Sequence, residues 1–440
     1  MATSARQTIA GSLIPEGRRK SDLQARVARL RDRAEAEFEQ RGWPSPKDEF
    51  WKGFSLDALS AIRFLRAPAI ASAPVAIPGW IGRLPGHLVV LIDGRHASGA
   101  EGIEATDGAR CATLARVIGQ STDPALRALG AISSSSPSVL TSLNMARWED
   151  GVWIRISENA RAPLIVIAHV VSTHEVPTAC HPRVLITAGE GSRAVIAEVH
   201  VGPPSKTYFV NAVTEIDLQA RAQVEHVRVL APGDDAWHVG STHVLQQESS
   251  RYASRLVSIG GGAVRDEVHA RLSGEGADTE LDGLFLAFGT RHLDHRTLVD
   301  HACVRGRSRQ LYKGIAAGRG KGGFRGRVLV RQGAQGTDAM QLSRNLVLSR
   351  DALLDSAPEL EIRADDVRCK HGSSTGALED DARFYLRCRG IGERDATTLL
   401  TSAFAREIVD RLSVPALREQ IAGLVDHEVS AASGAEEEWA

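Results

Sequence analysis

The sequence predicts a mainly β protein whose core lies between an N-terminal and a C-terminal helical domain. Three observations carry this prediction. From about residue 151 to 372, short runs rich in Val, Ile and Leu follow one another with almost no helical periodicity. Gly-rich breakers such as GEGS, PGDD and GGGA separate these runs, and in the later part they recur roughly every 14 residues. Helical spacing of apolar residues is found only before and after this region.

Composition narrows the class of protein. The 440 residues carry a formal net charge of −1, which gives no global field for nucleic acid or an anionic membrane. Aromatic residues make up only 5%, which argues against a base-stacking surface. The five cysteines form no CxxC pair, a pattern that suits a reducing compartment. No apolar run reaches the roughly 18 residues of a membrane span, so we expect a cytoplasmic protein without nucleic-acid or membrane partners.

Residues 1–150 are expected to form a helical and mixed domain. Apolar residues at helical spacing predict a helix over residues 20–42, with Ser21 as its N-cap. Pro44 and Pro46 prevent this helix from continuing. Further on, LVVLIDG is typical of a strand that ends in a turn, and DPALRALGAI is typical of a helix.

Residues 151–376 are expected to form the β core. Two architectures fit serial strands and turns: a sandwich and a solenoid. Gly-rich turns at nearly regular steps favour the solenoid, in which each coil covers the previous one. Runs such as AVIAEVHV alternate aliphatic with polar residues, as expected for strands with one face turned inward.

Residues 377–430 are expected to form a C-terminal helical domain. The segment LEDDARFYLRCRG ends at Gly390, which suits a helix C-terminus, and Pro415 suits the first turn of a later helix. Between them, one strongly amphipathic helix is predicted. Its apolar face comprises Leu399, Leu400, Ala403, Phe404, Ile408 and Leu412. Residues 431–440 are expected to be a disordered tail.

The segment EIRADDVRCKHGSSTG, residues 361–376, is the strongest candidate site. In an extended chain Cys369 and His371 point to the same face, before a Gly/Ser-rich turn. Arg368 and Lys370 flank the thiol and are expected to lower its pKa towards the metal-ligating thiolate. Two ligands are too few for a closed metal site, but they suit a site that another subunit completes. A half-buried cysteine beside a surface histidine fits the same residues equally well.

Two other motifs are expected to be coincidental. GRGKGG matches a dinucleotide fingerprint, but the strand-like FRGRVLVRQ follows it where a helix is required. A P-loop is also absent there, so we expect no ATP site in this chain. GSSTG matches the nucleophile motif of hydrolases between a strand and a helix, yet His427 is the only histidine that follows.

The chain resembles the SufB/SufD family of iron–sulfur cluster scaffold proteins, and more closely its SufD branch. The resemblance runs with gaps from about residue 40 to 412. ADDVRCKHG, which SufB-like chains lack, favours SufD. The matching segments are WPSPKDEFWK, FVNAVTEIDL, EHVRVL, DHRTLVDH, SRQLYKGI, GRVLVRQGAQGTDAMQLSRNLVLS, PELEIRADDVRCKHGSSTGAL and FYLRCRGI. The resemblance implies a right-handed parallel β-helix between two helical domains, in agreement with the solenoid prediction.

The resemblance also implies a function. A SufD-like chain is a non-catalytic subunit of a SufBCD-type complex, pairs with a SufB-like paralogue, and carries a SufC-like ABC-type ATPase on its C-terminal helices. A transient iron–sulfur cluster forms at the paralogue interface. The family's interface histidine corresponds to His371, with Cys369 as the second candidate ligand. Leu399, Phe404 and Ile408 lie in the candidate ATPase-docking region, and the isolated chain is expected to form a homodimer.

Two other functions compete with this one. A β-helix enzyme, such as a hydrolase or a polysaccharide-modifying enzyme, usually needs secretion and an aromatic-lined cleft. This sequence shows no secretion signal and few aromatic residues. A homo-oligomeric structural protein, whose exposed β-helix edge pairs with itself, is the third alternative.

Overall fold

The computed structural model describes most of the chain, from the first predicted helix to the last. The described residues are 22–45, 47–67, 75, 77–97, 103–106 and 108–435. The predicted N-cap Ser21 and the turn residue Pro46 lie outside them.

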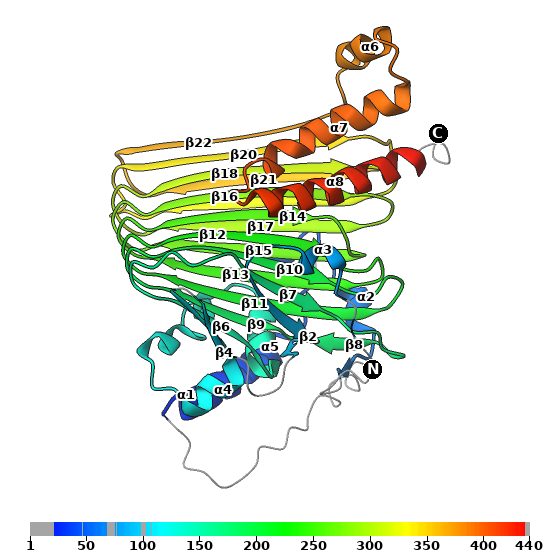
Figure 1. Ribbon diagram of the computed structural model, residues 1–440. Coiled ribbons are helices and arrows are strands. Elements are labelled where there is room, and N and C mark those ends of the chain that lie inside the picture. The colour runs from blue at the N-terminus through cyan, green and yellow to red at the C-terminus, as the bar shows by residue number, and fades with distance from the viewer. Residues whose placement is uncertain are drawn as a thin grey trace.

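The core consists of two β-sheets whose strands alternate along the chain (Figure 1). One sheet contains, in spatial order, β21 (Leu353–Ile362), β19 (Lys321–Val330), β17 (His292–His301), β15 (Ala263–Leu272), β13 (Trp237–Gln246), β11 (Tyr208–Leu218), β9 (Arg183–Ala188), β6 (Gly151–Ile156), β5 (Ala109–Thr113) and β4 (Ile103–Thr106). The other contains β22 (Val367–Gly376), β20 (Thr337–Val347), β18 (Arg307–Ala316), β16 (Asp278–Ala287), β14 (Arg251–Ser258), β12 (Gln223–Ala231), β10 (Arg193–Val201), β7 (Ile165–Val170), β2 (His87–Ile92) and β3 (Arg95–His96). From β6 and β7 onward, neighbouring strands in each sheet are parallel.

The strand register shows that the core is a solenoid and not a sandwich. Arg251 pairs with Asp278, Asp278 with Arg307, Arg307 with Asp338, and Asp338 with Arg368. One full coil therefore takes 27 to 31 residues and contains one strand of each sheet. The predicted spacing of breakers, roughly 14 residues, corresponds to half a coil because each coil has two turns.

Side chains between the sheets form the main apolar core. Residues such as Ile196, Leu256 and Val299 are fully buried there, whereas Ala197, Val199 and Val257 on the opposite strand face pack into a second apolar cluster. At the GRGKGG segment, Gly318 has φ +67° in the turn, a conformation that glycine adopts without strain. Strand β19 follows that turn directly, so the expected absence of a dinucleotide-binding helix after this motif is confirmed.

The N-terminal region lies at one end of the solenoid and is not separate from it. The predicted first helix is present as α1 (Asp22–Arg41) and packs on α5 (Val139–Arg147). The predicted strand at LVVLIDG is β2, but it pairs with β7 inside the second sheet, and β5 pairs antiparallel with β6 in the first. The expected boundary after residue 150 therefore divides both sheets. DPALRALGAI contains a short 3-10 helix, Pro124–Ala128.

A buried ion pair attaches this region to the outer face of the first sheet. Arg183 on β9 and Glu215 on β11 are both fully buried, with 2.7 Å between Nη2 and Oε2. The Glu215 carboxylate also accepts hydrogen bonds from the backbone N–H groups of Gly130 and Ser133, at 2.8 and 3.0 Å. Asn144 of α5 accepts a hydrogen bond from Arg183 at 2.8 Å. Both terminal nitrogens of Arg183 and both carboxylate oxygens of Glu215 are thus hydrogen-bonded, which offsets much of the cost of burying the charges.

The C-terminal region forms three helices. These are α6 (Asp380–Cys388), α7 (Glu393–Val409) and α8 (Pro415–Ala435), and Gly390 has φ +85° after the first of them, as predicted. α7 and α8 lie across the outer face of the second sheet, whereas α6 projects beyond the last coil (Figure 1). Residues 431–435 are helical instead of disordered as expected, and 436–440 lie outside the described residues.

No helix within the described ranges is long and apolar enough to cross a membrane.

Candidate functional site at the open end of the solenoid

The solenoid ends in a coil that is paired on one side only. Among the residues that the structure describes, β21 pairs only with β19, and β22 pairs only with β20. Most residues of these two strands are exposed or half-buried, whereas β16 and β17, further back in the solenoid, are almost wholly buried. Two ten-residue edges therefore present backbone N–H and C=O groups that another chain can pair with.

Cys369 lies on the inner side of this last coil. It pairs with Ala339 of β20 and packs, half-buried, against the core between the sheets. Burial raises the pKa of the thiol, and the backbone hydrogen bond from Ala339 offsets this only in part. The expectation that Arg368 and Lys370 lower this pKa is therefore wrong. Both are exposed, and desolvation of the thiol outweighs any attraction from them.

His371 lies two residues further along β22 and is exposed. It pairs with Gln341, whose side-chain amide is buried with neither its nitrogen nor its oxygen hydrogen-bonded among the described residues. The two predicted ligands thus occupy one strand at an open rim. Two ligands are too few for a closed metal site, which leaves room for ligands from another chain.

Polar residues extend this rim beyond the predicted pair. The Ser356 hydroxyl of β21 lies 2.8 Å from that of Ser343 and accepts a hydrogen bond from Asn345 at 2.9 Å. Asn345 also donates to the Thr375 hydroxyl of β22 at 3.3 Å. These residues were not predicted as site residues, because Ser, Thr and Asn in a strand give no distinctive sequence signal.

The GSSTG segment is not a turn, contrary to expectation. It continues β22 through Gly376, and Ser374 pairs in register with Arg344. A hydrolase nucleophile must stand on a sharp strand-to-helix turn. An exposed serine in a regular strand lacks that geometry.

The three predicted docking residues occupy different environments on α7. Leu399 is 51% exposed, whereas Ile408 is fully buried against the second sheet. Phe404 is half-buried, and the Lys313 ammonium lies 3.9 Å from its ring centroid. Lys313 also pairs with Glu407 at 2.5 Å. Of the three, only Leu399 offers most of its side chain to another molecule.

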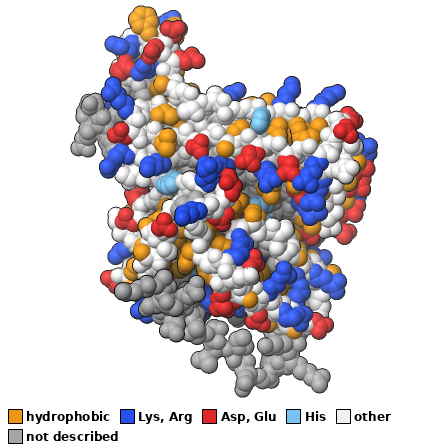
Figure 2. Space-filling model, turned by 180° about the vertical axis from the view of Figure 1, so that it is seen from behind, with side chains coloured by type: hydrophobic (Ala, Val, Ile, Leu, Met, Phe, Trp, Pro, Cys, Tyr) orange, Lys and Arg blue, Asp and Glu red, His pale blue; other side chains and the backbone are white. Residues whose placement is uncertain are grey.

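The largest exposed apolar side chains of this region lie on α6. Phe384 and Tyr385 are 68% and 58% exposed, and no α6 residue is buried. In Figure 2 the projection carries hydrophobic side chains at its tip. The sequence signal was the adjacent pair FY in an otherwise charged helix, which sequence reasoning had attributed only to helix formation. Exposed aromatic residues on a projecting helix are typical of a protein–protein contact.

A solenoid whose last coil has an open edge, with exposed aromatic side chains on a projecting helix, has two surfaces suited to protein–protein contact. Comparison with known proteins agrees. The family model described as "SUF system FeS cluster assembly, SufBD core domain" matches residues 169–404. The chain therefore belongs to the SufBD family of iron–sulfur cluster assembly proteins.

Individual relatives support the same assignment. An iron–sulfur cluster assembly SufBD family protein of Synechocystis is 30% identical over 390 residues, 86% of each chain. The iron–sulfur cluster assembly protein SufD of Escherichia coli is 28% identical over 382 residues, 86% of this chain and 88% of its own. The chloroplastic protein ABCI7 of Arabidopsis thaliana is 35% identical over 244 residues, 54% of this chain and 51% of its own.

Proposed function

We propose that this chain is the SufD-type, non-catalytic subunit of a cytoplasmic complex that assembles iron–sulfur clusters. Its last coil pairs with a SufB-like paralogue, and His371, with Cys369, supplies ligands for iron or a nascent cluster at that interface. The observation that carries the proposal is the unpaired edge of β22, which holds both ligands at an open rim. The free state of all five cysteines suits a reducing compartment. The same edge accounts for a homodimer of the isolated chain.

The ligand assignment is tested with His371→Ala in the complex co-expressed with its paralogue and ATPase. We expect iron and acid-labile sulfide per complex, measured after anaerobic purification, to fall at least tenfold. Native mass spectrometry should still show the intact complex, because an exposed side chain contributes little to folding. His427→Ala, an exposed histidine on α8, is the matched control and should change neither value. A normal iron content in the His371→Ala complex would show that His371 is not a ligand.

The projecting α6 is the proposed docking surface for a SufC-like ABC-type ATPase. Two adjacent exposed aromatic side chains, together with Leu399 on α7, form an apolar surface that solvent would otherwise cover. The chain itself supplies no P-loop, so ATP hydrolysis belongs to that partner.

Phe384→Asp with Tyr385→Asp is expected to abolish capture of the ATPase in a pull-down, because two charges would be desolvated in an apolar contact. The fold should be unaffected, since neither side chain is buried in the chain. Val176→Asp, a change at a 48% exposed residue remote from α6, is the control. Undiminished ATPase capture by the double variant would place the docking surface elsewhere.

A further inference from the structure

A second group of metal-ligating side chains lies inside the solenoid, far from the last coil. His169 on β7 and His200 on β10 are neighbours in the parallel register, and Glu198 precedes His200 by two residues on the same strand. All three side chains are buried. β10 is six strand steps from β22, which is roughly 29 Å at the usual spacing between strands. The group is therefore distinct from the rim that holds Cys369 and His371.

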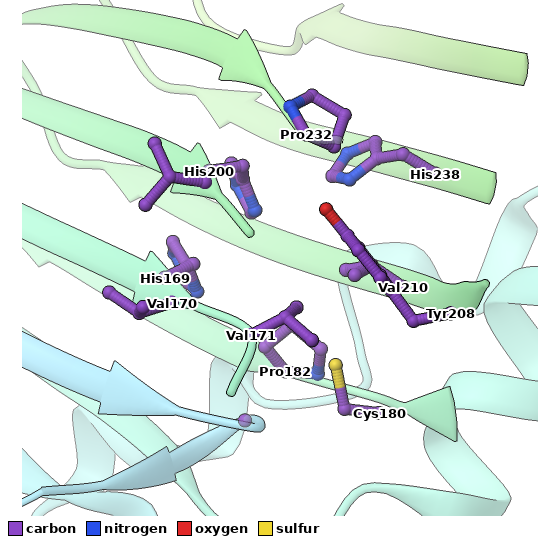
Figure 3. A pocket seen from close by; sticks show the side chains of 12 residues that line it. His169, Val170, Val171, Cys180, Pro182, His200, Tyr208, Val210, Pro232 and His238 are labelled. Atoms are coloured by element: carbon purple, nitrogen blue, oxygen red, sulfur yellow. The ribbon is translucent and has the colours of Figure 1, made fainter. Parts of the chain in front are cut away.

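The geometry of the three side chains suits a single ion. One donor atom from each residue can be chosen so that all three lie within 4.8 Å of one another. The two imidazole rings are stacked, with centroids 4.1 Å apart and planes 2° apart. Figure 3 shows one ring above the other. The same carboxylate oxygen of Glu198, Oε2, lies 2.9 Å from His169 Nε2 and 3.9 Å from His200 Nε2. Small side-chain rotations bring such atoms to the distances that imidazole and carboxylate ligands take around a transition metal.

Neighbouring groups orient the carboxylate towards this pair. The other oxygen, Oε1, accepts hydrogen bonds from Thr214 at 2.8 Å and from His226 at 2.9 Å. His226 is positioned in turn by the Tyr252 hydroxyl, 3.1 Å from its Nδ1. These contacts hold Oε1, while Oε2, within the described part of the chain, takes part only in the hydrogen bond with His169 that an ion would replace. An ordered set of partners behind the ligands is characteristic of metal sites.

The second ring nitrogens of three histidines face a small cavity and, within the described ranges, have no partner of their own. The Nδ1 atoms of His169, His200 and His238 are buried without a hydrogen-bond partner among the described residues. Such atoms are rare in folded proteins and costly when left unpaired. All three rings line one small cavity, which Cys180 and Tyr208 also line (Figure 3). Its space open to the centre of a water-sized sphere is about 10 Å³, which is room for one water or one ion.

We infer that His169, Glu198 and His200 form a binding site for one divalent transition-metal ion in the interior of this chain. Two imidazoles and one carboxylate are a ligand set that iron(II), zinc and cobalt(II) accept. An ion bound there replaces the hydrogen bond between His169 and Glu198, and the proton on His169 moves from Nε2 to Nδ1, so the imidazole stays neutral. The site is complete within one chain and does not depend on the proposed pairing of the last coil.

The purified full-length chain, stripped of metal with a chelator and then titrated with cobalt(II), tests the site. We expect one equivalent of cobalt to bind, with a rise in melting temperature because the ion binds only the folded chain. His200→Gln and Glu198→Gln should each weaken cobalt binding at least tenfold. His371→Ala should leave it unchanged, and so should His243→Ala, which alters a buried histidine stacked on His269.

The possible outcomes separate the two sites. The inference would be overturned by either of two results. One is loss of cobalt binding in His371→Ala but not in the Gln variants, and the other is unchanged cobalt binding in both Gln variants. If a Gln variant fails to fold, anomalous diffraction from cobalt-soaked crystals of the unaltered chain decides. A peak between β7 and β10 supports the site, and its absence at saturating cobalt refutes it. Failure here leaves the function proposed for the last coil untouched, since that function rests on other residues.

Discussion

Glu215→Ala is expected to lower the free energy of unfolding by about 3–5 kcal/mol, the cost of leaving one member of a buried ion pair without its partner. Arg183 would keep its charge in a site with no solvent exposure. The backbone N–H groups of Gly130 and Ser133 would lose their acceptor at the same time. The loss should appear as a lower midpoint in denaturant unfolding followed by circular dichroism. Hydrogen exchange of the amides of residues 130–133 should accelerate first.

Glu190→Ala is the matched control for this change. Glu190 pairs with Arg221 at the surface, where both side chains are about half exposed. Exposed ion pairs contribute roughly 0–1 kcal/mol, so little change in the midpoint is expected. If Glu215→Ala behaved like Glu190→Ala, the pair would not be what attaches the N-terminal region to the solenoid.

Leu360→Asp with Ile362→Asp is expected to weaken pairing with the paralogue at least a hundredfold, which is about 2.7 kcal/mol. Leu360 is half-buried against the core, and Ile362 is 43% exposed at the rim of the last coil. A second solenoid stacked on this coil would cover both side chains, so two carboxylates there would be desolvated without partners. The dissociation constant can be measured by titrating the separately purified paralogue.

The same titration with Val176→Asp controls for an added surface charge and should give the unaltered affinity. Circular dichroism should show that the double variant keeps its β content, because the earlier coils remain covered on both sides. Unchanged affinity in a folded double variant would mean that the paralogue does not pair through this end.

Pro358 lies between the substituted residues and the start of β21 and has no N–H to donate, so β22 is the better edge for backbone pairing.

The solenoid could be predicted because its signal is repeated along the chain. Each coil needs two turns, and glycine at positions such as Gly318 records where those turns fall. Runs that contain inward-facing Val, Ile and Leu indicate where the strands lie in the sequence. The pairing of β2 with β7 could not be predicted in this way, because 72 residues separate the two strands in the sequence. The sequence pattern therefore places a boundary at residue 150, between strands that share a sheet.

The environment of single side chains could be predicted less well. GSSTG has the composition of a turn, yet pairing with β20 holds it extended. Ile408 and Leu399 belong to one periodic face, but only the second half of α7 reaches the sheet, so one is buried and the other exposed. The pKa of Cys369 depends on burial, which neighbouring residues in the sequence do not reveal. His169 and His200 are 31 residues apart, and only the coil length brings them together.

The way α7 is attached has a mechanical consequence. Its C-terminal half is attached to the solenoid by the ion pair between Lys313 and Glu407. Arg411, just past the end of α7, donates a hydrogen bond to Asp282 of β16. The N-terminal half of α7 carries α6 into solvent (Figure 1). Because α7 is a rigid helix held through its C-terminal half, a force on its N-terminal end turns the helix about a point near Lys313. A partner that pulls on α6 therefore applies torque to β16 and β18, which lie only three and two strand steps from the open edge.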